Sequence, residues 1–138
     1  MDSSLVVSLY VIDANTPEAL QRMKKHPEAW LTPLNRTELA HAIHQSVFRK
    51  KISEFEAHRA WKAFEDDCTQ GVWIKANFPD TVWKTSIDLA RRYGPTLGIR
   101  TLDTLHVACA LELKPDRFWT FDERQARLAE AAGLDISA

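Results

Sequence analysis

The sequence predicts an α/β domain built around a parallel sheet. Three observations indicate this class: short apolar runs alternate with longer amphipathic stretches, most amphipathic stretches begin at a capping residue or a proline, and sparse Gly and Pro residues separate them. The chain has 138 residues, of which 45% are hydrophobic and 27% charged. Because this is the size and composition of one globular domain, we assign residues 1–138 to a single domain.

The expected strands are the short apolar runs at residues 29–31, 72–74, 117–121 and 134–136. Helices fill the intervals between them. Their start signals are Thr16-Pro17, Thr32-Pro33, Ser53 with Glu56, Asp80, Thr101 and Asp122, and their stop signals are Gly71, Gly94-Pro95, Lys114-Pro115 and Gly133. This alternation predicts strands that pair in parallel, joined by right-handed crossovers.

The opening segment is ambiguous. Leu5 to Ile12 is rich in Val, Leu and Ile, which favours a strand that ends at Asp13. The alternative is a helix over residues 3–10 with Asp2 as its N-cap. Propensity alone favours the strand.

Composition excludes several classes of protein. The net charge of -1 leaves no general basic field for nucleic acid, so any such contact requires a local patch. The two cysteines, Cys68 and Cys109, are too few for a disulfide framework and are expected as buried thiols in a reducing compartment. No apolar run approaches the ~18 residues of a membrane span, and no signal peptide is recognisable, so we expect a cytoplasmic protein without membrane contact.

Four acids lie where helices begin, which is where ligands bind in an open parallel sheet: Asp2, Glu38, Asp103 and Asp122. Each has an ordinary structural explanation as a helix cap, a capping-box partner or a first-turn charge. As a group they would repel one another unless a divalent cation lay between them. Ligands that are all carboxylate oxygens favour Mg²⁺ or Mn²⁺ over zinc.

Four segments in order along the chain carry a resemblance to a known family. They are Asp2-Ser3-Ser4-Leu5-Val6, Asn35-Arg36-Thr37-Glu38-Leu39-Ala40, Arg100-Thr101-Leu102-Asp103-Thr104-Leu105-His106-Val107-Ala108 and Trp119-Thr120-Phe121-Asp122. They resemble the signature segments of PIN domains, and among these the VapC-type toxin ribonucleases of type II toxin–antitoxin pairs. The likeness covers essentially the whole chain.

For the fold, the resemblance implies a three-layer α/β/α arrangement. Its parallel sheet has the strand order 3-2-1-4-5, with helices on both faces. The first acid falls on Asp2, which makes Ser3 to Tyr10 helical and Asp13 a loop residue; Asp13 as the first acid is the alternative. The family has a hydrophobic strand before its first acid, whereas only Met1 precedes Asp2 here, so the first strand is expected to be missing or truncated.

For the function, the resemblance implies an endoribonuclease of a toxin–antitoxin pair. Asp2, Glu38, Asp103 and Asp122 would bind one or two Mg²⁺ or Mn²⁺ ions, and water would attack the RNA phosphate to leave a 5′-phosphate and a 3′-hydroxyl. The hydroxyls of Ser4 and Thr120 match positions beside the acids. The implied partners are the RNA substrate, a small cognate antitoxin whose tail covers the acidic pocket, and a second copy of the chain in a homodimer.

Two other interpretations remain open. One is a catalytically silent PIN-like module that binds RNA or a protein. The other is an unrelated α/β domain with four well-capped helices, in which the four acids share no pocket. Near the acids, His106 is expected to pack within its helix, and Arg124 is a candidate phosphate contact. The basic run Arg49-Lys50-Lys51 is either a solvated helix end or a phosphate contact.

Overall fold

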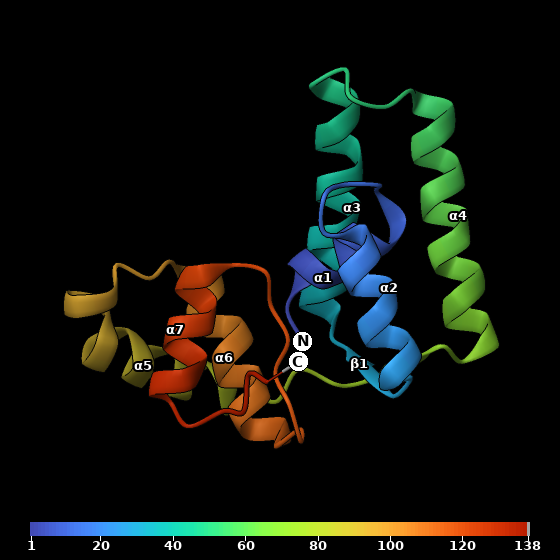
Figure 1. The fold of residues 1–138 in the computed structure, drawn as a ribbon. Helices are drawn as coiled ribbons and strands as arrows, with labels where there is room; N and C mark the ends of the chain where they lie inside the picture. The colour runs from blue at the N-terminus through green and yellow to red at the C-terminus, as the bar shows by residue number, and fades with distance from the viewer. Residues whose placement is uncertain (138) are drawn as a thin grey trace. The chain divides into compact units, whose positions relative to one another are not determined.

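The structure is a computed structural model that describes residues 1–137. Along the chain its elements follow the order α1, α2, β1, α3, α4, β2, α5, α6, α7 (Figure 1). They divide into two compact units, one of residues 3–76 and the other of Met1–Asp2 with the chain from Asn77 onward. A small parallel sheet combined with helices confirms the α/β class.

The unit of residues 3–76 contains the sheet. Its elements are α1 (Ser3–Tyr10), α2 (Thr16–Lys25), β1 (Ala29–Leu31), α3 (Pro33–Phe48), α4 (Glu54–Gln70) and β2 (Trp73–Lys75). Helix α1 packs against α2, α3 and α4, and Leu5 and Val6 on it are fully buried. Leu39 and Ile43 of α3 and Phe64 of α4 complete the apolar interior of this unit.

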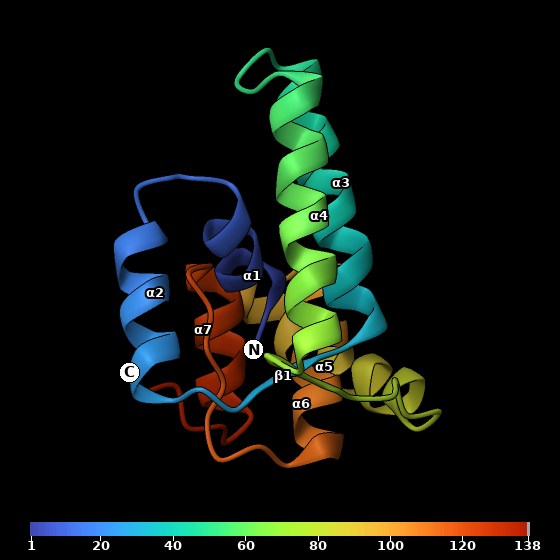
Figure 2. The ribbon, with the colours of Figure 1, turned by 90° about the vertical axis from the view of Figure 1, so that its right-hand side faces the viewer.

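Strands β1 and β2 pair in parallel, with Ala29 opposite Trp73 and Leu31 opposite Lys75. The crossover between them is a hairpin of two long helices, α3 and α4, which lie side by side in both ribbon views (Figures 1 and 2). Each helix of the hairpin begins with a hydrogen-bonded capping box. Thr32 and Asn35 form it at the start of α3, and Ser53 and Glu56 form it at the start of α4. Gly71, at φ 78°, ends α4 in the left-handed conformation that glycine adopts without strain.

The second unit is helical. Helix α5 (Val82–Leu97) packs against α6 (Thr101–Leu113), and both contact α7 (Glu123–Ala131). Its core gathers nine buried side chains: Val82, Leu89, Val107, Ala108, Cys109, Ala110, Phe118, Leu128 and Ala129. Both cysteines are free thiols, as the sequence predicts. Cys109 is buried as expected, whereas Cys68 in the other unit is only half-buried.

The opening segment is the helix that the family resemblance implies, not the strand that propensity favours. Residues Ser3–Tyr10 form α1, and Asp13 lies in the loop that follows. The Asp13 carboxylate accepts hydrogen bonds from the Ser8 hydroxyl and from the backbone N–H of Asn15. Asp13 therefore organises the turn between α1 and α2.

The two strands predicted at residues 117–121 and 134–136 were wrong, because neither segment belongs to a helix or a strand. Phe118 N–H donates to Asp135 O at 2.7 Å, and Asp2 N–H donates to Trp119 O at 2.9 Å. One backbone hydrogen bond to each neighbouring segment is too few to form a β-ladder. The sheet that the structure describes in residues 1–137 has the strands β1 and β2 alone, and the five-strand order stays a prediction.

The predicted start and end of α5 also need correction. The side chain of Asp80 does not cap the helix; the N-cap is Thr81, whose hydroxyl donates to Glu112 on α6. The helix continues past Gly94 and Pro95 and ends at Gly98, which has φ 57°. Packing of Leu97 on the core favours this extra turn over the stop signal. In residues 1–137, no helix is long and apolar enough to cross a membrane.

Candidate acidic site

Asp122 is positioned by the start of α7. It is the N-cap of that helix, and its Oδ1 accepts hydrogen bonds from the backbone N–H groups of Arg124 (2.9 Å) and Gln125 (3.3 Å). This is the capping role that the sequence predicts. Because Oδ1 is occupied, the other oxygen, Oδ2, is the one available to groups outside the helix.

Asp103 is positioned by the start of α6. It lies in the first turn, where its Oδ2 accepts the backbone N–H of Arg100 at 2.8 Å. Its Oδ1 lies 3.5 Å from the amide Nε2 of Gln125 on α7. Only 3% of Asp103 is exposed, so this carboxylate is nearly removed from water in a largely apolar helix.

The side chain of Arg100 joins these two acids. Its Nη2 donates to Asp122 Oδ2 at 2.9 Å, and its Nε lies 3.5 Å from Asp103 Oδ2. One guanidinium therefore contacts carboxylates that are 19 positions apart in the sequence (122 − 103). Sharing a cation reduces the repulsion between them.

Thr120 joins Asp122 to the third acid. Its hydroxyl donates to Asp2 Oδ2 at 2.7 Å and accepts the backbone N–H of Asp122 at 2.9 Å. This confirms that the Thr120 hydroxyl hydrogen-bonds an acid. Asp2 is itself 3% exposed and also donates its backbone N–H to Trp119. The second unit thus holds Asp2, Asp122 and Asp103 in one network linked by Thr120 and Arg100, which we call the acid network.

Glu38 belongs to the other unit. It lies in the second turn of α3, half-buried, and the capping box of that helix is made by Thr32 and Asn35 instead. Capping therefore does not account for Glu38, contrary to the structural explanation that its spacing from Asn35 suggested. Asn35, which is fully buried, donates to the Ser3 hydroxyl at 3.2 Å and so ties the start of α3 to the start of α1. That Glu38 shares a site with the other three acids stays a prediction.

The family model described as PIN domain matches residues 1–131, which is nearly the whole chain. The chain belongs to the PIN domain family. No curated protein matches it. PIN domains are generally nucleases, which are hydrolases, and PIN nucleases typically use divalent metals.

The side chains of the acid network suit such a metal chemically. Among residues 1–137 no three His, Cys, Asp or Glu side chains form a group that could hold an ion by themselves. Mg²⁺ does not require one, because it commonly keeps several waters and takes only one or two protein carboxylates. Beside Asp103, Oε1 of the buried Gln125 has no hydrogen-bond donor in the described part of the chain. It is an acceptor that a water held by the ion would satisfy.

The thiol of Cys109 is buried in the core of the second unit. Burial raises its pKa to about 11. The neutral thiol therefore predominates at neutral pH, and thiols bind metals and attack substrates as thiolates.

Two residues of the acid network, Arg100 and Gln125, were missed as site residues from the sequence. Arg100 stands in the quoted motif immediately before Thr101, but nothing in its spacing shows that it reaches Asp122. Gln125 lies three residues after Asp122, at the spacing of a capping box, but its amide contacts Asp103 on α6. Arg124, the candidate phosphate contact, has its Nε 4.0 Å from Asp122 Oδ1, and His106 is buried in α6, as expected.

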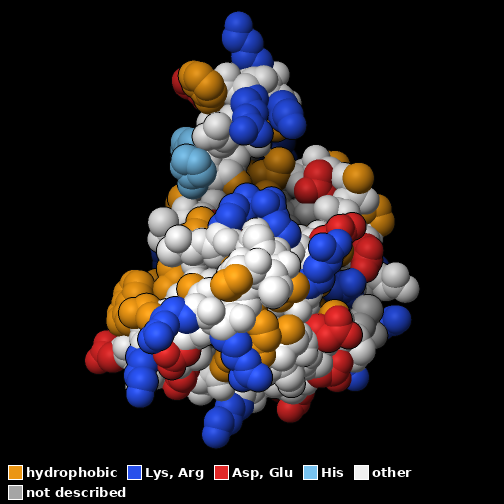
Figure 3. Space-filling view, turned by 90° about the vertical axis from the view of Figure 1, so that its left-hand side faces the viewer, with side chains coloured by type: hydrophobic (Ala, Val, Ile, Leu, Met, Phe, Trp, Pro, Cys, Tyr) orange, Lys and Arg blue, Asp and Glu red, His pale blue; other side chains and the backbone are white. Residues whose placement is uncertain are grey.

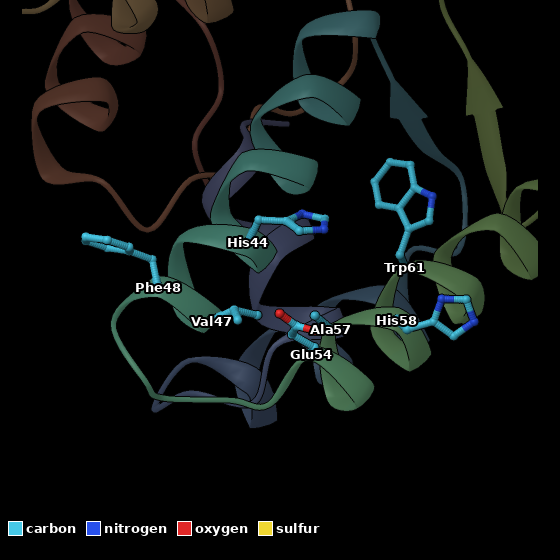
Figure 4. Close-up of a pocket in the computed structure, with 7 residues that line it drawn as sticks. All are labelled: His44, Val47, Phe48, Glu54, Ala57, His58 and Trp61. Carbon is cyan, nitrogen blue, oxygen red and sulfur yellow. The ribbon is translucent and has the colours of Figure 1, made fainter.

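A separate hollow lies between α3 and α4, with a volume of about 470 Å³. Its lining residues are His44, Val47, Phe48, Glu54, Ala57, His58 and Trp61. Figure 4 shows the His44 ring reaching toward the Trp61 side of the hollow, and Phe48 pointing away from it. His44 Nδ1 lies 2.7 Å from Ala40 O, and because a carbonyl only accepts, Nδ1 is the donor of this hydrogen bond.

The turn between α3 and α4 is basic. Arg49, Lys50 and Lys51 are all exposed there, and Figure 3 shows Lys and Arg side chains gathered at the tip of the hairpin. Phe48 and Phe55, on either side of this turn, are also strongly exposed. The hairpin thus presents aromatic and cationic groups together, which is a surface suited to contact with another macromolecule.

Proposed function

We propose that this PIN domain is a metal-dependent endoribonuclease and the toxin of a VapBC-type toxin–antitoxin pair. The observation that carries the proposal is the acid network: Asp2, Asp103 and Asp122, far apart in the sequence, are linked by shared hydrogen-bonding partners. With the α3 residue Glu38 they would hold Mg²⁺ or Mn²⁺, directly or through water.

Each part of the network has a defined task in this proposal. A bound divalent ion supplies activation of water and neutralises the charge that develops on the phosphate. Thr120 fixes the orientation of the Asp2 carboxylate by donating to it, and the first turns of α6 and α7 hold Asp103 and Asp122. Burial of Asp2 and Asp103 limits water around the reacting groups.

The direct test is cleavage of RNA by the full chain with Mg²⁺, with and without EDTA, beside the Asp103→Asn variant. Asparagine retains an oxygen that accepts the Arg100 N–H, so the start of α6 is preserved while the charge is removed. We expect EDTA to stop cleavage and Asp103→Asn to lower its rate by about 100-fold or more. Equal activity of the variant would exclude the proposed chemistry.

The partner proteins form a second part of the proposal. A small antitoxin would bind this chain and cover the acids; the exposed Phe48 and Phe55 beside the α3–α4 hollow support contact with another protein. Trp83 and Ile87, exposed one turn apart on α5, support a homodimer. Light scattering of the purified chain tests the dimer. Inhibition of cleavage by a small protein encoded beside the gene tests the antitoxin.

The second candidate function is a PIN-like module that binds RNA or protein without cleaving it. The observation in its favour is that a protein cation, Arg100, already contacts both Asp103 and Asp122. Titration with Mn²⁺ separates the two functions. A silent module would show no Mn²⁺ binding that depends on these carboxylates.

A further inference from the structure

Arg100 stands at an unfavourable place for an arginine. It is the N-cap of α6, with an extended backbone at φ -104° and ψ 164°. Ser, Thr, Asp and Asn are the preferred residues there, because their side chains accept the free N–H groups of the first turn, whereas a guanidinium only donates. The N-terminus of a helix also carries partial positive charge, which disfavours a cation. Local helix stability therefore does not explain this residue.

Two carboxylates compensate for that position. Asp103 binds Arg100 twice, through the backbone N–H at 2.8 Å and through Nε at 3.5 Å, and both contacts use Oδ2. Asp122 binds the far end of the guanidinium, and there too the oxygen is Oδ2. The arginine side chain is 57% exposed and the Asp103 side chain 4%, so the cation covers the acids from the solvent side.

We propose that the Arg100 guanidinium is the resident counter-cation of the acid network and competes with a divalent metal ion for Asp103 and Asp122. This inference rests on the metal site of the proposed function. Binding of the ion displaces the guanidinium from at least one of the two Oδ2 atoms. Arg100 thereby sets the metal concentration at which the site fills.

The competition follows from the atoms involved. Oδ1 of Asp122 is committed to the backbone of α7, so Oδ2 is the oxygen with which that carboxylate meets a cation. On Asp103 the guanidinium lies against Oδ2, which also accepts the Arg100 backbone N–H, while Oδ1 faces Gln125. A dication within ligand distance of these oxygens and a guanidinium at 2.9 Å repel each other as like charges. The two therefore bind with negative coupling, so that removing one strengthens the other.

The test is a calorimetric titration of the metal-free full chain with Mn²⁺, comparing the wild type with Arg100→Gln. We expect Arg100→Gln to bind Mn²⁺ about 5- to 10-fold more tightly, and Arg100→Lys, which keeps the charge, to lie closer to the wild type. The matched control is Arg124→Gln. It removes another arginine beside Asp122, one whose Nε is 4.0 Å from the committed Oδ1, and should change the affinity less than about twofold.

Two further features make the test decisive. Arg100→Asn places a preferred capping residue at the start of α6, so it serves as the competition test if Arg100→Gln fails to fold. Mn²⁺ binding by Arg100→Gln or Arg100→Asn that is equal to or weaker than wild-type binding would overturn the inference, as would no Mn²⁺ binding by any form. Tighter binding without RNA cleavage by any form would leave the inference standing and remove the proposed ribonuclease function.

Discussion

Each of the two units contains a hydrogen-bonded cluster around one or more carboxylates, and the two clusters compensate the negative charge with different kinds of donor. In the unit of residues 3–76, Asp67 Oδ2 accepts the Tyr10 hydroxyl at 2.6 Å, and that hydroxyl in turn accepts Trp73 Nε1 at 2.8 Å. The Tyr10 ring packs edge-on against Phe64, with the ring centroids 5.4 Å apart. The Asp67 carboxylate thus accepts from one neutral hydroxyl, which is itself held by a second neutral side chain.

The acid network has more negative charge and includes a protein cation among its donors. Asp2, Asp103 and Asp122 share Thr120 and a half-exposed arginine that sits at a helix end where a cation is disfavoured. Polar clusters that stabilise a fold satisfy every member locally, whereas functional sites keep arrangements that are costly by themselves. The difference supports the proposal that the acid network binds a cation, and it leads us to expect that the Tyr10–Asp67 cluster contributes to stability.

The largest expected effect comes from removing the negative charge of Asp122 while keeping its role as the N-cap of α7. Asp122→Asn keeps an excellent N-cap for α7 and removes the negative charge. We expect RNA cleavage to fall by about 100-fold or more, with little change in thermal stability, as measured by a cleavage assay and by calorimetric melting.

Asp135→Asn is the control for this substitution. Asp135 is a carboxylate of the same unit that also accepts a backbone N–H, from Ser137, but it lies outside the acid network. It should retain full cleavage. A large drop in melting temperature for Asp122→Asn, with proportionate loss of activity, would make Asp122 a structural cap and nothing more.

The second-largest expected effect is a loss of stability without a change in metal binding, in the unit of residues 3–76. Tyr10→Phe leaves the Asp67 carboxylate and Trp73 Nε1 without their shared partner, so we expect unfolding free energy to fall by about 1–3 kcal/mol while Mn²⁺ affinity stays unchanged. Chemical denaturation and Mn²⁺ titration measure the two quantities. Tyr93→Phe, which loses one exposed hydrogen bond to Ala131 O, should cost less. Equal losses in the two variants would contradict a special role for the Tyr10–Asp67 cluster.

The smallest effect is a dependence of stability on alkaline pH. Burial, and then the hydrogen bond to the Asp67 carboxylate, raise the pKa of Tyr10 well above its usual value. The folded protein therefore holds the phenol proton more tightly than the unfolded chain, and this stabilisation is complete below the usual tyrosine pKa near 10 and is lost as the pH rises toward the folded-state value. The difference should stay below about 1 kcal/mol at pH about 11, because Tyr10 is partly exposed.

Melting curves of the wild type and Tyr10→Phe between pH about 8 and pH about 11 measure this dependence. The wild type should lose stability more steeply above pH about 10. Parallel curves would mean that Tyr10 titrates normally.

Local signals in the sequence were enough for most helices of the fold. Ser53 with Glu56 and Gly71 bound α4 because caps depend on residues within one turn. The α1 segment shows the limit of such signals. Its β-branched residues favour a strand, but burial of Leu5 and Val6 among three other helices stabilises the helix, and propensity alone contains no information about those neighbours.

Burial was easier to predict than pairing. Phe118 and Trp119 are buried, as the apolar run indicated, yet the segment forms no strand because a ladder requires a partner supplied by distant residues. The acids show the same contrast between features that neighbouring residues predict and contacts that depend on distant residues. Capping patterns place Asp122 correctly at a helix start, while its contact with Arg100, 22 positions away, depends on the fold.

The central claim is that Asp2, Asp103 and Asp122 form the binding site of a divalent ion. A crystal of the full chain soaked in Mn²⁺ tests it most directly, because manganese is located by its anomalous scattering. We predict a manganese peak within about 2.2 Å of a carboxylate oxygen of Asp103 or Asp122, with Arg100 moved from that oxygen. A manganese peak elsewhere would contradict the account. So would a structure at saturating Mn²⁺ in which Arg100 still contacts Asp103 and Asp122 while Thr120 still contacts Asp2.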